Sequence, residues 1–248
     1  MTTKCIPTAS LTSENPGANM AEFVTPQFWI AVAEIILVNI LLSGDNAVVI
    51  ALACRNLSQR QRRHGIFWGV LGAIVLRIGL TFFAMSLLVY PWLRLVGAAL
   101  LLWIGVKLVA EDDSGEHKVK ASDRLLTAIG TIIVADLVMS LDNVVAVAAA
   151  AKGNLPLLIF GLVISVPIVI VGSQIIMKLI ERFPVLVLAG GGLLGYIAGE
   201  MAVEDPVIQP WIATNAASLA ALAPPVFFGF VVVAGMWLIR RRNRARSR

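Results

Sequence analysis

Two short polar clusters interrupt long apolar stretches of the sequence. The first, in "LLSGDNAVVI", contains Ser43, Asp45 and Asn46. The second, in "MSLDNVVAVA", contains Asp142 and Asn143. A charged side chain in the middle of a membrane costs about 2.5–3.5 kcal/mol on insertion scales, so its default interpretation there is functional. Because the two clusters resemble each other, they predict one shared mechanism rather than two independent accidents.

The polar residues of each cluster continue along one helix face. Asp136, Ser140 and Asn143 are spaced i, i+4, i+7, which places them on the same face. The donor atoms are carboxylate, amide and hydroxyl oxygens, and neither cluster contains Cys or His. Oxygen-only ligands suit hard divalent cations such as Mg²⁺, Ca²⁺ and Mn²⁺. The predicted cation-site residues are Asp45, Asn46, Asp136, Asp142, Asn143, Asn39, Ser43 and Ser140.

The charges of the two clusters allow exchange of a cation against protons. Asp45, Asp136 and Asp142 sum to three negative charges, and Arg77, in "AIVLRIGL", could act as a counter-ion with one positive charge. The remaining two negative charges would balance one divalent cation or two protons. Glu34 precedes Asp45 by eleven residues on nearly the same face, so it could line the entry path.

Composition indicates which elements must position these residues. Of the 248 residues, 58% are hydrophobic and only 14% are charged, whereas about a quarter are charged in a typical soluble domain. Apolar stretches of about 20 residues can cross a bilayer as helices, and these runs are too long and too uniform for membrane strands. We therefore predict an all-α integral membrane protein. Seven transmembrane helices are expected, at about 28–53, 66–89, 92–110, 125–150, 155–180, 184–203 and 222–239.

An internal repeat relates the two polar clusters. When Asp45 is aligned with Asp142, "LLSGDNAVVIALA" faces "LVMSLDNVVAVAA", and "LLLWIGVKLVAEDD" faces "GLLGYIAGEMAVED". Each repeat has three spans, so the second must enter the membrane in the opposite sense to the first. Inverted repeats are typical of secondary transporters, whose binding sites lie near the midplane. The repeats cover about 28–112 and 125–205, and the helix at about 222–239 is an addition.

Helix rise places both aspartates at the same depth. Asp45 lies ten residues before Arg55, and Asp142 lies ten residues before Lys152. Ten residues rise about 15 Å, which is half of a hydrocarbon core roughly 30 Å thick. The two carboxylates are therefore predicted near the midplane, approached from opposite sides.

Basic residues predict the orientation. "RNLSQRQRRH" follows the first span and "RRRNRARSR" follows the last, and loops rich in Lys and Arg lie on the cytoplasmic side. The N-terminus is then outside and the C-terminus cytoplasmic. The basic runs are assigned to topology and anionic lipid, not to nucleic acid. We expect a disordered, non-cytoplasmic tail at 1–25, a single membrane transport domain at 26–240 and a basic cytoplasmic tail at 241–248.

The motifs "SGDNAVVIALA", "IIVADLVMSLDNV" and "GYIAGEMAVED" resemble those of the TerC family, most closely its shorter branch linked to metal transport. The resemblance covers nearly all of 27–239. It implies a bacterial inner-membrane protein of the lysine-exporter-like superfamily, whose members are linked to manganese efflux. The first repeat has Asn39 where the second has Asp136, so the half-sites differ in charge. By this resemblance the cation-site residues are Asp45, Asn46, Asp142 and Asn143.

These observations favour an exporter of a hard divalent cation, with Mn²⁺ first, driven by proton exchange. It is not expected to be an enzyme or to hold a cofactor; its partners are the lipid bilayer, the cation and protons, and a homo-oligomer is left open. The alternative is a non-transporting membrane scaffold whose motifs are interhelical polar clamps. An intramembrane aspartyl protease is disfavoured, because the chain lacks the Tyr-Asp and Gly-x-Gly-Asp patterns of such enzymes. An amino-acid exporter is disfavoured by the shortage of mid-membrane cations.

Overall fold

The computed structural model is helical throughout the part of the chain that it describes. That part comprises residues 29–30, 32–33, 36–37, 44–87, 90–111, 121–150 and 155–246, with the backbone alone at 82–87, 142–150 and a few other helix positions. The main helices are α3 (Gly44–Cys54), α4 (Gln59–Leu87), α5 (Leu93–Ala110), α6 (Ala121–Ala150), α7 (Leu155–Arg182), α8 (Val185–Val203), α9 (Gln209–Asn215) and α10 (Ala217–Arg246).

Six helices are long and apolar enough to cross a membrane: α4, α5, α6, α7, α8 and α10. The prediction of an all-helical membrane protein is therefore confirmed for the described residues, but the count of seven spans is not. Within the predicted first span, the described part holds α3, whose 11 residues rise only about 16 Å, roughly half a hydrocarbon core.

The C-terminal part differs from the prediction in two respects. The short helix α9 was not expected, and α10 extends past 222–239 at both ends, into the predicted basic tail. Arginine is a strong helix former, so the basic run continues the helix once α10 has begun. The tail predicted at 241–248 is thus mostly an extension of the last spanning helix in the described residues.

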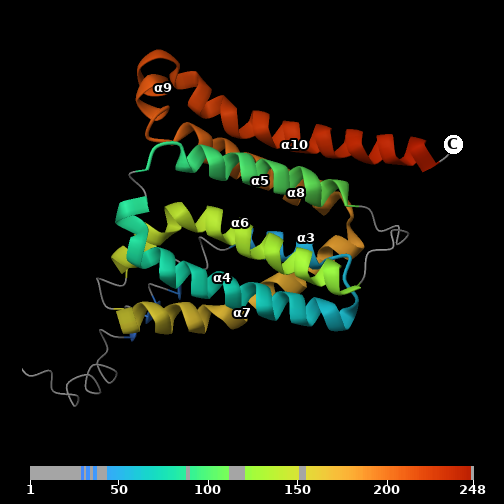
Figure 1. The fold of residues 1–248 in the computed structure, drawn as a ribbon, viewed down its shortest axis with the longest axis horizontal. Helices are drawn as coiled ribbons and strands as arrows, with labels where there is room; N and C mark the ends of the chain where they lie inside the picture. The colour runs from blue at the N-terminus through green and yellow to red at the C-terminus, as the bar shows by residue number, and fades with distance from the viewer. Residues whose placement is uncertain are drawn as a thin grey trace, which may run out of the picture.

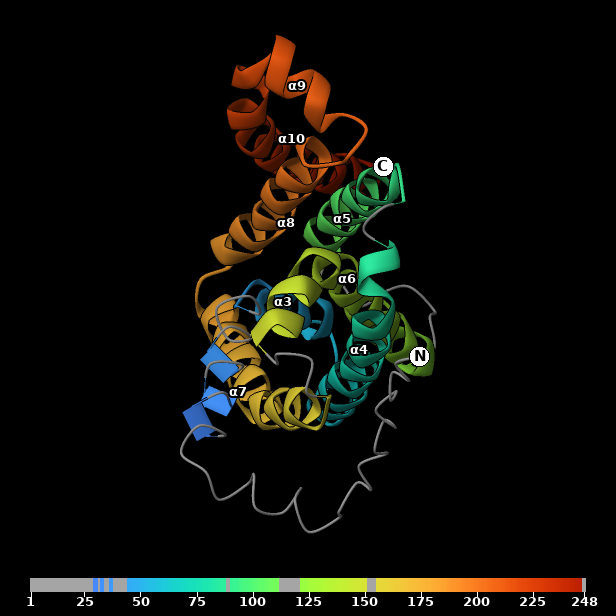
Figure 2. The same cartoon turned by 90° about the vertical axis from the view of Figure 1, so that its left-hand side faces the viewer.

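The spanning helices lie alongside one another in layers (Figures 1 and 2). On one side α10 covers α8 and α5, which also pack against each other. Helices α6 and α3 lie in the middle, and α4 and α7 form the opposite side. Helix α4 packs mainly on α6, and α3 packs on both α6 and α7. The middle layer therefore holds the first polar cluster against the helix that carries the second.

Glycines allow backbone contact between α8 and its neighbours. A Cβ atom on Gly195 would lie 2.5 Å from the carbonyl oxygen of Phe227, and one on Gly199 would lie 2.6 Å from the Cα atom of Pro224. Small residues let membrane helices approach closely. Gly195 and Gly199 thus hold α8 tightly against α10.

Polar contacts tie the helix ends together at both edges of the bundle. At one edge the Arg62 guanidinium pairs with Glu181 at 2.7 Å, which links the start of α4 to the end of α7. Gln61 reaches back to Ser58 there: its Oε1 atom accepts the Ser58 backbone N–H at 3.4 Å, which is one half of a capping box, and the Ser58 hydroxyl at 2.9 Å. At the opposite edge, buried Asp205 accepts the Leu95 backbone N–H at 3.3 Å, joining α8 to α5.

Candidate functional site

A buried polar network lies where α3, α4 and α6 meet. Asn46 is the third residue of α3, Arg77 comes from α4, and Asp136 and Ser140 lie one turn apart on α6. The side chains are almost fully enclosed: the exposed fractions are 5% for Asn46, 5% for Arg77, 8% for Asp136 and 0% for Ser140. Asp136 lies near the middle of the 30-residue α6, so the network occupies the centre of the bundle.

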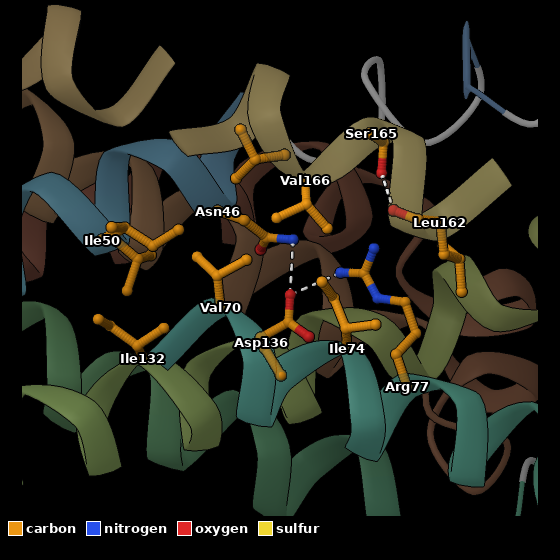
Figure 3. Close-up of a pocket in the computed structure, with 13 residues that line it drawn as sticks. Asn46, Ile50, Val70, Ile74, Arg77, Ile132, Asp136, Leu162, Ser165 and Val166 are labelled. Carbon is orange, nitrogen blue, oxygen red and sulfur yellow. Dashed lines mark hydrogen bonds and ion pairs between the residues drawn. The ribbon is translucent and has the colours of Figure 1, made fainter. Parts of the chain in front are cut away.

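The Asp136 carboxylate is the centre of this network (Figure 3). Its Oδ1 atom accepts from an Arg77 terminal nitrogen at 2.5 Å and from Asn46 Nδ2 at 2.9 Å. Its Oδ2 atom accepts from the Ser140 hydroxyl at 3.2 Å. Arg77 Nε also donates to Ser140 Oγ at 2.9 Å. Two helices thus share one buried ion pair, and Ser140 bridges both of its members.

One acceptor of this network has no partner among the described residues. Asn46 donates through Nδ2, but its buried Oδ1 accepts no hydrogen bond. Leaving a buried polar atom unsatisfied costs about 1–3 kcal/mol, so each such atom in a native protein calls for an explanation. An oxygen with free lone pairs beside a carboxylate is what a hard cation requires.

A cavity adjoins the network (Figure 3). Asn46, Arg77 and Asp136 form its polar wall, and Ser165 on α7 adds a hydroxyl. The other walls are mostly aliphatic side chains of α3, α4, α6 and α7. The cavity volume is about 40 Å³. A cavity of this size can hold water or an ion with a few waters.

The structure brings together four of the residues singled out in the sequence: Asn46, Asp136, Ser140 and Arg77. Asp45, in the first turn of the same helix, is half-buried and accepts the Asn46 backbone N–H at 2.8 Å rather than lining the cavity. In the described part of the chain, no three His, Cys, Asp or Glu side chains form a metal-binding group. Glu34, Asn39 and Ser43 lie outside the described residues, and Asp142 and Asn143 are described only by the α6 backbone.

Two features of the site went beyond the sequence reasoning. Arg77 was expected as a possible counter-ion, but its partner was not identified; the structure pairs it with Asp136 and Ser140. The contribution of α7, including Ser165, was not foreseen. In the sequence, a single serine that lines a cavity looks the same as a serine that packs between membrane helices. No sequence signal therefore distinguishes these two roles.

Comparison with known proteins identifies the chain at family level. The family model described as "Integral membrane protein TerC family" matches residues 24–245. The uncharacterized membrane protein YjbE of Bacillus subtilis is 41% identical over 210 residues, covering 85% of this chain and 95% of YjbE.

More distant relatives cover less of the chain. The membrane protein YceF of Bacillus subtilis is 27% identical over 186 residues, covering 71% of this chain and 72% of YceF. The inner membrane protein YgdQ of Escherichia coli K12 is 28% identical over 177 residues, covering 64% of this chain and 74% of YgdQ. No solved structure matches the chain.

Proposed function

Because this chain belongs to the TerC family of integral membrane proteins, we propose that it is a transporter that exports a hard divalent cation from the cytoplasm. Mn²⁺ is the first candidate and protons are the exchanged ions. The chain is a multi-pass protein of the bacterial inner membrane.

The observation that carries this proposal is Asn46 Oδ1, which has no partner among the described residues and lies beside the Asp136 carboxylate, next to a cavity in the centre of the bundle. Carboxylate and amide oxygens favour Mg²⁺, Ca²⁺ and Mn²⁺ over Zn²⁺ or Cu⁺. Asp45 and Asp142 would complete the ligand set as the helices move. The small volume favours an ion over an organic substrate.

The helix packing supports alternating access. Helix α4 packs on α6, and α3 packs on α7. If α3 to α5 and α6 to α8 are two inverted repeats, α3 corresponds to α6 and α4 corresponds to α7. The α4–α6 contact and the α3–α7 contact are then equivalent. A site between such repeats can open to either side when one repeat rocks against the other.

The charge distribution supports the assignment of one edge of the bundle to the cytoplasm. The edge that holds Arg55, Arg60 and Arg62 also holds the basic end of α10 (Figure 1). Cytoplasmic loops carry an excess of basic residues, so this edge is assigned to the cytoplasm. The direction of transport itself is the proposal and rests on the family resemblance.

A second candidate, a non-transporting membrane scaffold, is favoured by one specific contact. Arg77 and Ser140 already satisfy the Asp136 carboxylate, as they would in a purely structural clamp between α4 and α6. A scaffold predicts that loss of the carboxylate changes stability but leaves metal levels unchanged.

Cellular manganese, measured by mass spectrometry, separates the two candidates. A strain lacking its own exporters is loaded with Mn²⁺ while carrying the intact chain, Asp136→Asn, or Asp123→Asn as a matched control. Asp123 is an exposed carboxylate on the same helix. Membrane abundance is measured in parallel. If the chain is an exporter, cellular manganese should be low with the intact chain and with the control, and high with Asp136→Asn. Equal manganese in all of these strains and in the strain that does not carry the chain would rule out Mn²⁺ export.

A further inference from the structure

We infer that Arg77 is a tethered competitor of the transported ion: its guanidinium occupies the Asp136 carboxylate when the site is free and is displaced when a divalent cation binds. This inference rests on the proposed function and assigns Arg77 the role of setting cation affinity and release.

The competition follows from the position of the guanidinium. An Arg77 terminal nitrogen lies 2.5 Å from Asp136 Oδ1, the same atom to which Asn46 Nδ2 donates. A divalent cation bound to that oxygen would lie within a few ångströms of the guanidinium, in surroundings that screen charge poorly. Two positive groups cannot share that oxygen at these distances, so binding of the ion requires Arg77 to withdraw.

The structure gives Arg77 a second anchor besides the Asp136 carboxylate. Its Nε atom donates to Ser140 Oγ at 2.9 Å, and that bond does not involve Asp136. The guanidinium can therefore leave the carboxylate without losing every partner.

Asn46 can respond to the same exchange. Its amide nitrogen faces Asp136, and its Oδ1 has no partner among the residues that the structure describes. Rotation of the amide by half a turn presents Oδ1 to an ion at the carboxylate. Asn46 can therefore donate through Nδ2 to the carboxylate when Arg77 is bound, and offer Oδ1 to the ion when the ion is bound.

A tethered competitor has a definite effect on transport. The ion would otherwise bind a buried carboxylate tightly and leave it slowly. The returning Arg77 guanidinium lowers the affinity and speeds release. Removal of the positive charge should therefore strengthen binding while slowing export, which a residue with only a structural role would not do.

Direct Mn²⁺ binding to the purified full chain in lipid nanodiscs tests the inference by isothermal titration calorimetry. Arg77→Gln should lower the apparent Kd at least tenfold, and Arg77→Lys, which retains the charge, should remain near the intact protein. Arg94→Gln is the matched control, because Arg94 pairs with Glu204 at the edge of the bundle and should leave the Kd unchanged. Thermal unfolding and elution volume check that each variant is folded.

The outcomes separate this inference from the proposed function. If the intact chain binds Mn²⁺, Asp136→Asn abolishes binding, and folded Arg77→Gln binds no more tightly, the competitor role is wrong and the transport site stands. If no form binds Mn²⁺, both are wrong. If Arg77→Gln does not fold, Ser140→Ala replaces it; loss of the second anchor should change the Kd at least twofold, and an unchanged Kd overturns the inference.

Discussion

The charge of Asp136 can be removed with little change in shape by the substitution Asp136→Asn. The variant leaves the Arg77 guanidinium, only 5% exposed, opposite a neutral amide. Arg77→Gln produces the reverse defect, a buried carboxylate without its cation. The double variant carries neither charge, so it tests whether the two side chains stabilise the fold as a pair.

The structure sets the expected magnitude. Two unit charges about 4 Å apart interact by about 4 kcal/mol at an effective dielectric constant of 20. Removal of one partner of a buried ion pair costs about 3–5 kcal/mol. An amide oxygen at position 136 can still accept a hydrogen bond, which restores about 1 kcal/mol. We therefore expect each single variant to lose about 3 kcal/mol of unfolding free energy, and the double variant to lose much less than the sum.

Unfolding by SDS in mixed micelles, followed by tryptophan fluorescence, measures these values, since the chain has six tryptophans. Asp123→Asn should change the free energy of unfolding by no more than about 0.5 kcal/mol, as an exposed substitution does. The decisive quantity is the coupling energy between positions 77 and 136. A coupling energy below about 0.5 kcal/mol would mean that the two sites act independently, and the description of the network as a charge pair would be wrong.

Two further predictions concern packing and orientation. Gly195→Ala should lower the unfolding free energy by about 1–3 kcal/mol, because the added Cβ atom would lie 2.5 Å from a carbonyl oxygen of α10; Gly130→Ala, with nothing within 4 Å of its Cβ position, is the matched control and should show no loss. With Cys5 replaced by Ser, Tyr90→Cys should react with a membrane-impermeant maleimide in intact cells, whereas Arg244→Cys should react only after permeabilisation; the opposite pattern would reverse the assigned topology.

Local spacing allowed part of the site to be predicted from the sequence. Asp136 and Ser140 are four residues apart, so helix geometry places them on one face, and the structure joins them by a hydrogen bond. The long apolar runs likewise predicted the membrane helices, because a bilayer requires about 20 apolar residues for each span. Both signals lie within single helices.

Features that depend on contacts between helices could not be predicted in the same way. Arg77 and Asp136 are 59 residues apart, and their pairing depends on how α4 rotates against α6. The cavity lies between four helices, so no single segment of the sequence predicts it.

The glycine contacts between α8 and α10 also bear on how the protein is made. Helix α8 precedes α10 in the chain, so it leaves the ribosome before the backbone against which Gly195 and Gly199 pack. Until α10 is made, Gly195 and Gly199 lack these partners, whereas Gly190 and Gly191 face the earlier helices α3 and α5. The contacts of Gly195 and Gly199 can therefore form only when α10 docks, which makes this docking the last packing step on α8.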